Sequence, residues 1–436
     1  MSLRELLGKQ LIFADGGMGT ELQSAGLGAG ESPVLWNVTH PDEIKRIHSA
    51  YLDAGATFVT SNTFGANALK LAGTAYGVEE IVSAGVSLAR AAVDQQERAC
   101  FVALDIGPLG GFLKPFGDIS FDDAVELFKE QVVAGVAAGA DFVIIETMIE
   151  MRELKAAILA AKEASDVPIV ASVALNEQGR MLSGAAVPCV CALLEGLSVD
   201  ALGFNCGAGP REIASFVREL SALASTPLLF SPNAGLPEVV DGQAVYNTTP
   251  SEFADYMKPL VEDCVAIAGG CCGTTPAHIA ALVAACKDVV LKPASPPKTR
   301  FISSYAVALD LDSKEFQIDR RIDATTNEAL AEALVAGNYE RAIDEVFNAL
   351  DEGAEIIGLN AIHPDLDELE VLPALVDAIQ GATRTPLLIE SARVEALKSA
   401  LRVYAGCALV DLKCIAPDKK EAARSIVSYY GGQQLG

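Results

Sequence analysis

Residues 142–146 read Phe-Val-Ile-Ile-Glu, a run of four apolar residues that ends at a carboxylate. Such a short, continuous apolar run is typical of a buried strand in a parallel sheet. Similar runs recur along the first two thirds of the chain, and alanine-rich stretches of helical length separate them. We therefore predict strands at residues 11–15, 57–61, 101–105, 142–146, 169–174, 201–205, 227–231 and 265–269. Helices are predicted at 41–54, 79–97, 121–138, 151–164, 211–224 and 276–285.

Polar or reactive residues lie where these predicted strands end. They are Asp15, Asn62, Asp105, Glu146, Cys206, Asn233, Cys271 and Cys272. Eight βα units of this size match an α/β fold of the (β/α)₈ or TIM barrel type, in which all strand ends meet on the face that carries the active site. An open doubly wound sheet is the alternative, but it would spread the same residues along one edge. The pattern favours the barrel, over residues 1–291.

A second, smaller region follows a proline-rich segment. Residues 292–299 read Lys-Pro-Ala-Ser-Pro-Pro-Lys-Thr, which predicts a linker. Beyond it, strands are predicted at 316–322, 355–360, 386–390 and 408–412, and helices at 327–335, 339–351, 366–380, 394–403 and 418–430. These units are half the number that closes a barrel, so residues 300–436 are predicted to form a partial βα barrel. Its strand edges would need covering by the first domain or by a second chain.

The composition restricts the partners of this protein. Its formal net charge is −26, which disfavours nucleic acids and anionic membranes because both select for clustered basic residues. We find no uninterrupted apolar run long enough to span a membrane, and the N-terminal residues lack the apolar stretch of a signal peptide. We expect a cytoplasmic enzyme with no nucleic-acid or membrane partner.

Three of the ten cysteines form a candidate metal site. Cys206 lies in Gly-Phe-Asn-Cys-Gly at 203–207, and Cys271 and Cys272 lie in Gly-Gly-Cys-Cys-Gly at 269–273. Each segment follows a predicted strand, and the chain has only four scattered histidines. Three thiolates with an open fourth position are typical of catalytic zinc. A redox pair of adjacent cysteines is the alternative, although it would form a strained disulfide. The other seven cysteines are predicted to be buried, small apolar residues.

At these residues the sequence resembles the homocysteine S-methyltransferase family, and in particular the homocysteine domain of cobalamin-dependent methionine synthases. The likeness is carried by Asp-Gly-Gly-Met-Gly-Thr-Glu at 15–21, Thr-Ser-Asn-Thr-Phe-Gly-Ala-Asn at 60–67, Gly-Phe-Asn-Cys at 203–206, Pro-Asn-Ala-Gly-Leu-Pro at 232–237 and Gly-Gly-Cys-Cys-Gly-Thr at 269–274. The resemblance implies that zinc on the three cysteines activates the thiol of homocysteine for methylation to methionine.

The resemblance also implies roles for the residues around the cysteines. The turn at Asp15, Gly16 and Gly17 would lie beside the amino acid, and Glu146 would hold its ammonium group. Asn233 would lie near the zinc and the substrate. Thr20 and Asn62 are further candidates for substrate binding. We interpret Asp105 as a structural residue at the barrel rim.

Residues 316–436 resemble the first half of the pterin-binding barrel that follows the homocysteine barrel in methionine synthases. The likeness rests on 327–334, 337–339 and 351–357, which are mostly helix and packing positions. The pterin-binding positions differ: the family's Gly-Glu-Arg-x-Asn is Asp-Arg-Arg-Ile-Asp at 319–323, an expected Asp is Gly358, and an expected Asp-Ser-Ser is Glu-Ser-Ala at 390–392. An expected Asn is Asp411, whereas Asn360 is retained. We expect a structural or docking role rather than folate binding.

The source of the methyl group is left open by the sequence. No Asp-x-His-x-x-Gly motif for a corrinoid's lower ligand occurs in it. The donor is expected to be a separate molecule, such as a methylated corrinoid protein that carries cobalamin, methylfolate, or a small sulfonium or betaine compound. Two alternative functions remain: methylation of another small thiol, and a non-catalytic role as a zinc- or thiol-binding partner of a corrinoid protein.

Overall fold

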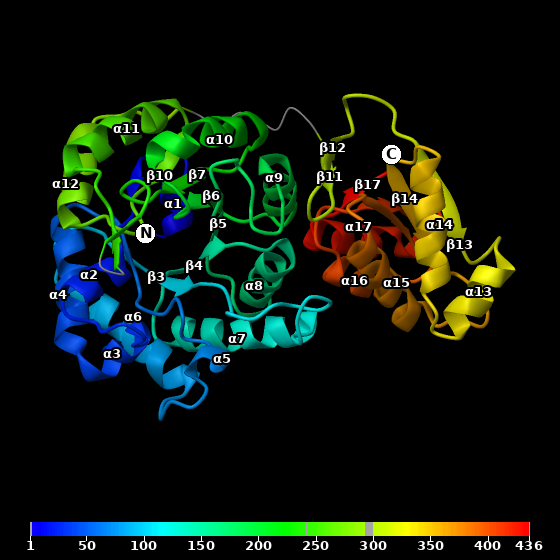
Figure 1. Cartoon of the computed structure of the whole chain (residues 1–436), viewed down its shortest axis with the longest axis horizontal. Helices are drawn as coiled ribbons and strands as arrows, with labels where there is room; N and C mark the ends of the chain where they lie inside the picture. The colour runs from blue at the N-terminus through cyan, green and yellow to red at the C-terminus, as the bar shows by residue number, and fades with distance from the viewer. Residues whose placement is uncertain (1, 241–242, 293–299, 436) are drawn as a thin grey trace. The chain divides into compact units, whose positions relative to one another are not determined.

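The computed structural model describes residues 2–240, 243–292 and 300–435. The chain divides into two compact units (Figure 1). The first comprises Met1–Leu182 and Val199–Pro296, and the second comprises Ser183–Ser198 and Pro297–Gly436. Most of the predicted linker at 292–299 lies outside the described residues, so the predicted domain boundaries stay a prediction.

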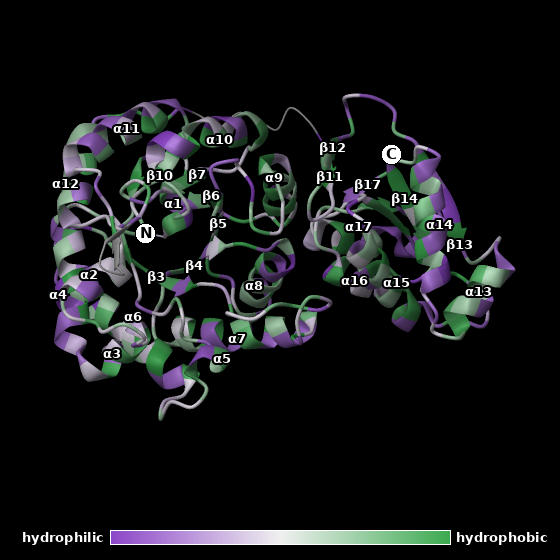
Figure 2. Ribbon diagram, viewed as in Figure 1, coloured by the Kyte–Doolittle hydropathy of each residue, from purple (hydrophilic) through white to green (hydrophobic). Residues whose placement is uncertain are grey.

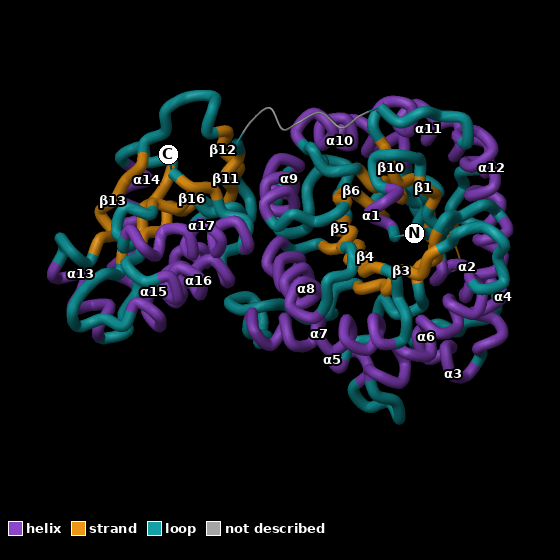
Figure 3. The backbone as a smooth tube through the Cα atoms, turned by 180° about the vertical axis from the view of Figure 1, so that it is seen from behind, coloured by secondary structure: helices purple, strands orange, loops and turns teal. Residues whose placement is uncertain are grey.

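The first unit is built on one eight-stranded sheet. Its order is β1-β10-β7-β6-β5-β4-β3-β2, and all paired neighbours are parallel. The strands form a ring enclosed by helices (Figure 3). They are β1 (Ile12–Phe13), β2 (Phe58–Thr60), β3 (Phe101–Ile106), β4 (Phe142–Met148), β5 (Ile169–Val173), β6 (Ala201–Asn205), β7 (Leu228–Ser231) and β10 (Val265–Ala268). The predicted (β/α)₈ barrel is thus confirmed.

The barrel closes where β1 meets β2. The backbone N–H of Thr57 donates to the carbonyl of Phe13 at 2.6 Å, and the N–H of Phe13 donates to the Thr57 hydroxyl at 3.0 Å. Nearer the carboxyl ends of the two strands, the Asp15 carboxylate accepts from the N–H of Thr60 at 2.8 Å and from its hydroxyl at 3.0 Å. A carboxylate therefore completes the seam that two short strands leave open.

Apolar side chains fill the barrel and the layer beneath the helices. The short helix α1 (Leu3–Leu6) closes one end of the core with Leu3 and Leu6, which pack with residues of all eight strands. Figure 2 shows the central strands in green, whereas the surrounding helices are mixed, as expected of helices with one buried face. These helices are α4 (Pro41–Asp53), α6 (Val78–Val93), α7 (Phe121–Ala137), α8 (Met151–Ala164), α10 (Pro210–Leu223), α11 (Pro250–Asp263) and α12 (Pro276–Cys286).

The second unit contains an open sheet of five parallel strands in the order β13-β14-β15-β16-β17. The strands are β13 (Ile318–Asp323), β14 (Ile356–Asn360), β15 (Leu387–Glu390), β16 (Leu409–Asp411) and β17 (Gln433–Gln434). The helices that follow its strands are α13 (Glu328–Val335), α14 (Glu340–Asp351), α15 (Glu368–Ala382), α16 (Val394–Val403) and α17 (Lys420–Tyr429). Four strands were predicted; β17 was missed because it is short and polar.

A hairpin covers one face of this sheet, and the sequence did not predict it. It consists of β11 (Phe301–Ser303) and β12 (Ala308–Asp310). Its Ile302 is fully buried against Ile356, Leu388 and Leu409, which lie in the first half of their strands. The hairpin therefore covers the apolar half of this sheet face. The other half, near the carboxyl ends of the strands, lies outside this apolar cluster.

Helix α9 (Val187–Gly196) belongs to the second unit although it connects β5 to β6. It packs against β11 and β12. At its last residue, Gly196, an added Cβ would lie 2.7 Å from the carbonyl oxygen of Gly431, so only glycine fits there. The chain thus leaves the first unit for one helix and returns to it.

None of the helices in the described ranges combines the length and the apolar content needed to cross a membrane.

Helix α4 contains a buried histidine that should make stability depend on pH. His48 is fully buried, and neither ring nitrogen has a hydrogen-bond partner among the described residues. Burial lowers its pKa to about 4. The unfolded chain, with a histidine pKa near 6.5, binds this proton more readily than the folded chain does. The contribution of neutral His48 to stability is therefore complete above about pH 6.5, and it is lost as the pH falls towards 4.

We predict that His48→Leu reduces the pH dependence of the free energy of unfolding by about 3 kcal/mol. This is the free energy that corresponds to a pKa shift of this size. Urea unfolding at pH 7.5 and pH 4.5 would measure the difference. His40→Gln, at an exposed histidine, is the control. Equal pH dependence in the wild type and His48→Leu would contradict the prediction.

Candidate metal and substrate site

The structure brings the three predicted cysteines together. Cys206 directly follows β6, and Cys271 and Cys272 follow β10, so they lie at the carboxyl ends of the two parallel strands that flank β7. The sulfur of Cys272 lies 3.8 Å from that of Cys206 and 4.0 Å from that of Cys271. Within the described ranges this is the one cluster of histidine, cysteine and acidic residues close enough to hold a metal ion.

The spacing of the sulfurs fits a tetrahedral metal ion. Zinc–sulfur bonds of about 2.3 Å at tetrahedral angles separate the ligand sulfurs by about 3.8 Å. The two sulfur–sulfur distances at Cys272 are close to that value, and all three sulfurs lie within 4.8 Å of one another. Two of the three sulfur–sulfur distances thus fit tetrahedral coordination of one metal ion.

Backbone hydrogen bonds hold the cysteine segments in place. The N–H of Cys206 donates to Ser231, that of Cys271 donates to Pro232, and that of Ala234 donates to the carbonyl of Cys272. Cys206 itself has a φ of 55°, in the left-handed region that non-glycine residues rarely adopt. Such a conformation persists only where the surrounding structure fixes it. The segment after β7 therefore connects both cysteine segments.

Glycines let the first loop approach the cysteine loop. A Cβ on Gly17 would lie 2.7 Å from the carbonyl oxygen of Cys271. One on Gly16 would lie 2.7 Å from the hydroxyl of Thr274. That hydroxyl accepts from the N–H of Gly17 at 3.1 Å and donates to the carbonyl of Cys271 at 2.7 Å. The residues predicted to form a turn beside the substrate thus also anchor the metal-site loop.

The cysteines open into a cavity of about 480 Å³. Its lining includes every predicted site residue except Asn233: Asp15, Gly16, Gly17, Thr20, Asn62, Glu146, Cys206, Cys271 and Cys272. Asn233 lies beside the sulfur of Cys206, whose pKa is lowered mainly by hydrogen bonds from the other two thiols and also by one from Asn233. The Oδ1 atom of Asn233 has no hydrogen-bond partner among the described residues.

The buried carboxyl groups of Asp15 and Asp105 and the half-buried carboxyl group of Glu146 face this cavity. Burial raises the pKa of Asp15 to about 7, against the opposing effect of its hydrogen bonds from Thr60. Burial, and next the negative charges of Asp15 and Cys206, raise the pKa of Glu146 to about 8. Burial also raises the pKa of Asp105, with Glu146 the next cause. The cavity therefore favours a cation, which would restore the charged form of these groups.

Asp105 differs from its sequence interpretation. We interpreted it as a structural residue at the rim, but it lines the cavity, and its Oδ1 atom has no hydrogen-bond partner in the described part of the chain. Its position at the end of β3 was the signal that could have identified it. Among the predicted residues, Asn62 and Thr20 line the cavity and also have contacts within the protein. Asn62 donates to Pro33 and Asn37, and the Thr20 hydroxyl accepts from Gly273.

Sequence reasoning missed two groups that contact the cysteines. The amide of Asn205 lies 3.9 Å from the sulfur of Cys271. The hydroxyl of Tyr246 forms a hydrogen bond with Cys272, and burial together with the nearby cysteine charges raises the pKa of Tyr246. Tyr246 follows the hairpin of β8 (Glu238–Val240) and β9 (Gln243–Val245), outside the predicted barrel strands, so no strand pattern marked it.

Asn205 also fixes the end of β4. Its Oδ1 accepts from the N–H of Thr147 at 2.7 Å and from the hydroxyl of Ser172 at 2.8 Å, and its amide donates to the Thr147 hydroxyl at 2.7 Å. Thr147 has a φ of 58°, which is unfavourable for a β-branched residue. The Asn205 side chain thus holds the residue that follows Glu146 in a strained conformation.

We predict that Asn205→Ala destabilises the protein by about 3 kcal/mol, because it leaves two buried donors without an acceptor. Urea unfolding with reductant and a chelator present would measure this without any effect of bound metal. Asn247→Ala, at an exposed position, is the control. A loss below about 1 kcal/mol would show that water replaces the amide.

Comparisons with known proteins identify a family for this chain. The family model described as homocysteine S-methyltransferase matches residues 12–286. The chain is 29% identical to the methionine synthase of Mycobacterium tuberculosis over 427 residues, and 29% identical to that of Mycobacterium leprae over 433 residues. These alignments cover 93% and 94% of this chain but 36% of each relative, so the chain spans about a third of their length.

Solved structures of a homocysteine methyltransferase share the barrel. The oxidized form of MmuM from Escherichia coli matches with a TM-score of 0.55 and 25% identity, over 65% of this chain and 98% of that one. Its metallated form matches with a TM-score of 0.55 and 26% identity, over 63% of this chain and 96% of that one.

Proposed function

Because the chain belongs to the homocysteine S-methyltransferase family, we propose that it methylates the thiol of homocysteine to form methionine, with zinc held by Cys206, Cys271 and Cys272. The observation that carries this proposal is the cluster of three sulfurs within 4.8 Å of one another, which opens to a cavity lined by three carboxyl groups. The existence of a metallated form of MmuM supports a metal here.

Zinc bound to three thiolates would accept the substrate sulfur in its fourth position and favour its ionised, nucleophilic form. The protein residues would supply orientation. Gly16 and Gly17 line the cavity, and their lack of side chains lets this loop pack directly against the cysteine loop. Asn233 and Tyr246 contact the sulfurs from two other segments and would fix their positions.

The carboxyl groups would recognise the amino end of the substrate. Glu146 is half-buried, shares the cavity with Asp15 and Asp105, and meets no basic residue there except Lys70 among the described lining residues. The arrival of an ammonium group would favour ionisation of these carboxyls and form charge-assisted hydrogen bonds with them. This explains why an amino acid thiol would be preferred over a simple thiol.

The methyl donor is proposed to be a separate molecule, a methylated corrinoid protein or methylfolate. A screen would test homocysteine with methylcobalamin, methylated corrinoid protein, methylfolate, S-methylmethionine and betaine, and would score methionine. Product with one donor is the expected result. Zinc and homocysteine binding without product from any donor would instead favour the non-catalytic partner, and product only with other thiols would change the acceptor.

We predict that the full chain purifies with about one zinc ion and that Cys206→Ala lowers zinc affinity at least about tenfold, because it removes one of three ligands. Metal analysis after dialysis against a chelator series would measure this. Cys100→Ala, at a cysteine outside the cluster, should keep its zinc. Zinc content that is absent in the wild type, or equal in both variants, would exclude the proposed centre.

We predict that Glu146→Gln weakens homocysteine binding about tenfold or more while zinc content stays unchanged, since a charged hydrogen bond is lost. Calorimetric titration of the zinc-loaded protein would measure it. The desamino analogue 4-mercaptobutanoate should bind wild type and variant alike. Glu177→Gln, at an exposed glutamate, is the control. Equal losses for both thiols would assign Glu146 a structural role instead.

A further inference from the structure

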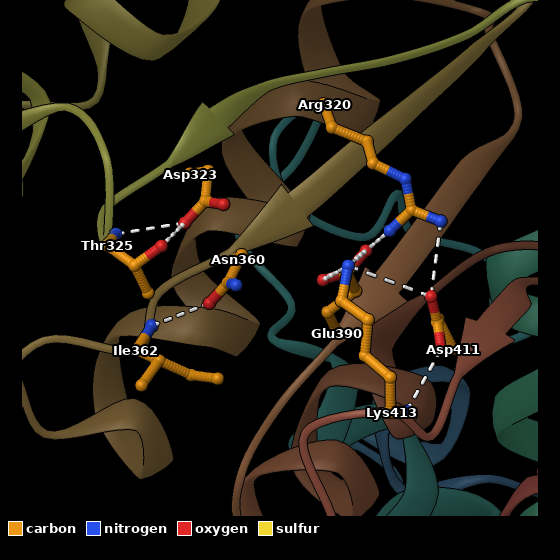
Figure 4. A network of polar contacts seen from close by, with 8 residues as sticks. All are labelled: Arg320, Asp323, Thr325, Asn360, Ile362, Glu390, Asp411 and Lys413. Atoms are coloured by element: carbon orange, nitrogen blue, oxygen red, sulfur yellow. Dashed lines mark hydrogen bonds and ion pairs between the residues drawn. The ribbon is translucent and has the colours of Figure 1, made fainter.

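A row of polar side chains marks the strand ends of the second sheet (Figure 4). The last residues of four adjacent strands are in register: Asp323 with Asn360, Asn360 with Glu390, and Glu390 with Asp411. Ligands of α/β proteins usually bind outside the carboxyl ends of parallel strands. This row is therefore where a pterin would be expected, given the resemblance of the region to a pterin-binding barrel.

The guanidinium of Arg320 occupies the middle of this row. It forms an ion pair with the carboxylate of Glu390, and its Nη2 atom lies 3.1 Å from Oδ2 of Asp411. The Glu390 side chain is only 4% exposed, so its charge needs a partner within the protein. Lys413 adds a second cation, with Nζ 2.9 Å from Oε2 of Glu390. Figure 4 shows both cations directed at this carboxylate.

Gly358 makes room for Arg320. It lies on β14, and a Cβ added there would be 3.1 Å from Cγ of Arg320. A longer side chain at this position would occupy the path of the arginine stem. The resemblance implies a pterin-binding aspartate at this position. In this chain Gly358 stands there instead, and the side chain of Arg320 passes over it.

The remaining polar groups of the row are engaged by the chain itself. The carboxylate of Asp323 accepts from the N–H and the hydroxyl of Thr325, at 2.9 and 2.6 Å. The Asn360 Oδ1 accepts from Ile362 at 2.9 Å, and the Asp411 Oδ1 accepts from the N–H of Lys413 at 2.9 Å. All four side chains of the row therefore already have acceptor contacts within the unit.

We propose that this site is filled by the protein's own Arg320 and takes no pterin. A pterin presents the adjacent N–H groups of its aminopyrimidine edge, which a carboxylate can bind as it binds a guanidinium. Here Glu390 is already paired with a guanidinium. A pterin would have to displace a cation from the buried carboxylate of Glu390, and the neighbouring carboxylate of Asp411 is also in contact with Arg320. The residues present do not fit the cofactor that the resemblance implies.

Two measurements on the full chain test this proposal. Titration with 5-methyltetrahydrofolate up to about 1 mM should show no saturable binding that Asn360→Ala weakens. Arg320→Ala should lower the unfolding temperature of the second unit by about 5 °C or more, because Glu390 loses its bridging partner. Hydrogen exchange of peptides spanning 386–412 would assign the change to β15 and β16. Guanidinium chloride at low millimolar concentration should restore part of the loss, whereas sodium chloride at equal ionic strength should not.

Control variants separate this effect from a general loss of charge. Lys413→Ala removes a cation that is half exposed and should cost less than Arg320→Ala, and Arg341→Ala, at an exposed arginine of α14, should cost nothing. If Arg320→Ala does not fold, Arg320→Lys should lower the unfolding temperature without rescue by guanidinium. An unchanged unfolding temperature would overturn the proposal. So would saturable methyltetrahydrofolate binding that is weakened by Asn360→Ala but not by Cys206→Ala.

Discussion

The contact between β1 and β2 is the constraint on which the first unit depends. These strands are short, and the seam between them is completed by the Asp15 carboxylate on Thr60. Closing the seam brings the loop after β1 over the cysteine loop after β10, because β10 is the other neighbour of β1. The same carboxylate lines the cavity. Barrel closure and site assembly are therefore one event, and a change at Asp15 would affect both.

Much of the first unit could be predicted because its signals are local. Each barrel strand is a continuous apolar run, and each run ends at a residue whose chemistry stands out, such as Glu146 or Cys206. A barrel brings all such ends to one face, so a list of strand ends is also a list of neighbours. This reasoning placed the cysteines together without any information on distances. It also explains why Asp105, which ends β3, lines the cavity despite our structural interpretation.

The features that were missed depend on contacts between distant segments. Asn205 supports Thr147 from a strand two positions away in the sheet, and Tyr246 reaches Cys272 from beyond a hairpin. Neither residue has a local pattern that marks it. In the second unit, the substitutions at Gly358 and Arg320 were visible separately as departures from a binding motif. Their relation became clear only in the structure, where the side chain of Arg320 passes over Gly358.

The path of the chain through α9 has a consequence for how the two units can be inherited. Residues 183–198 leave the barrel, add a helix to the second unit and return, so the units are interleaved along the sequence rather than joined end to end. A recombination event at the proline-rich segment would take the β11–β12 hairpin away from α9 and uncover its apolar surface. The barrel and the second sheet are thus not exchangeable modules.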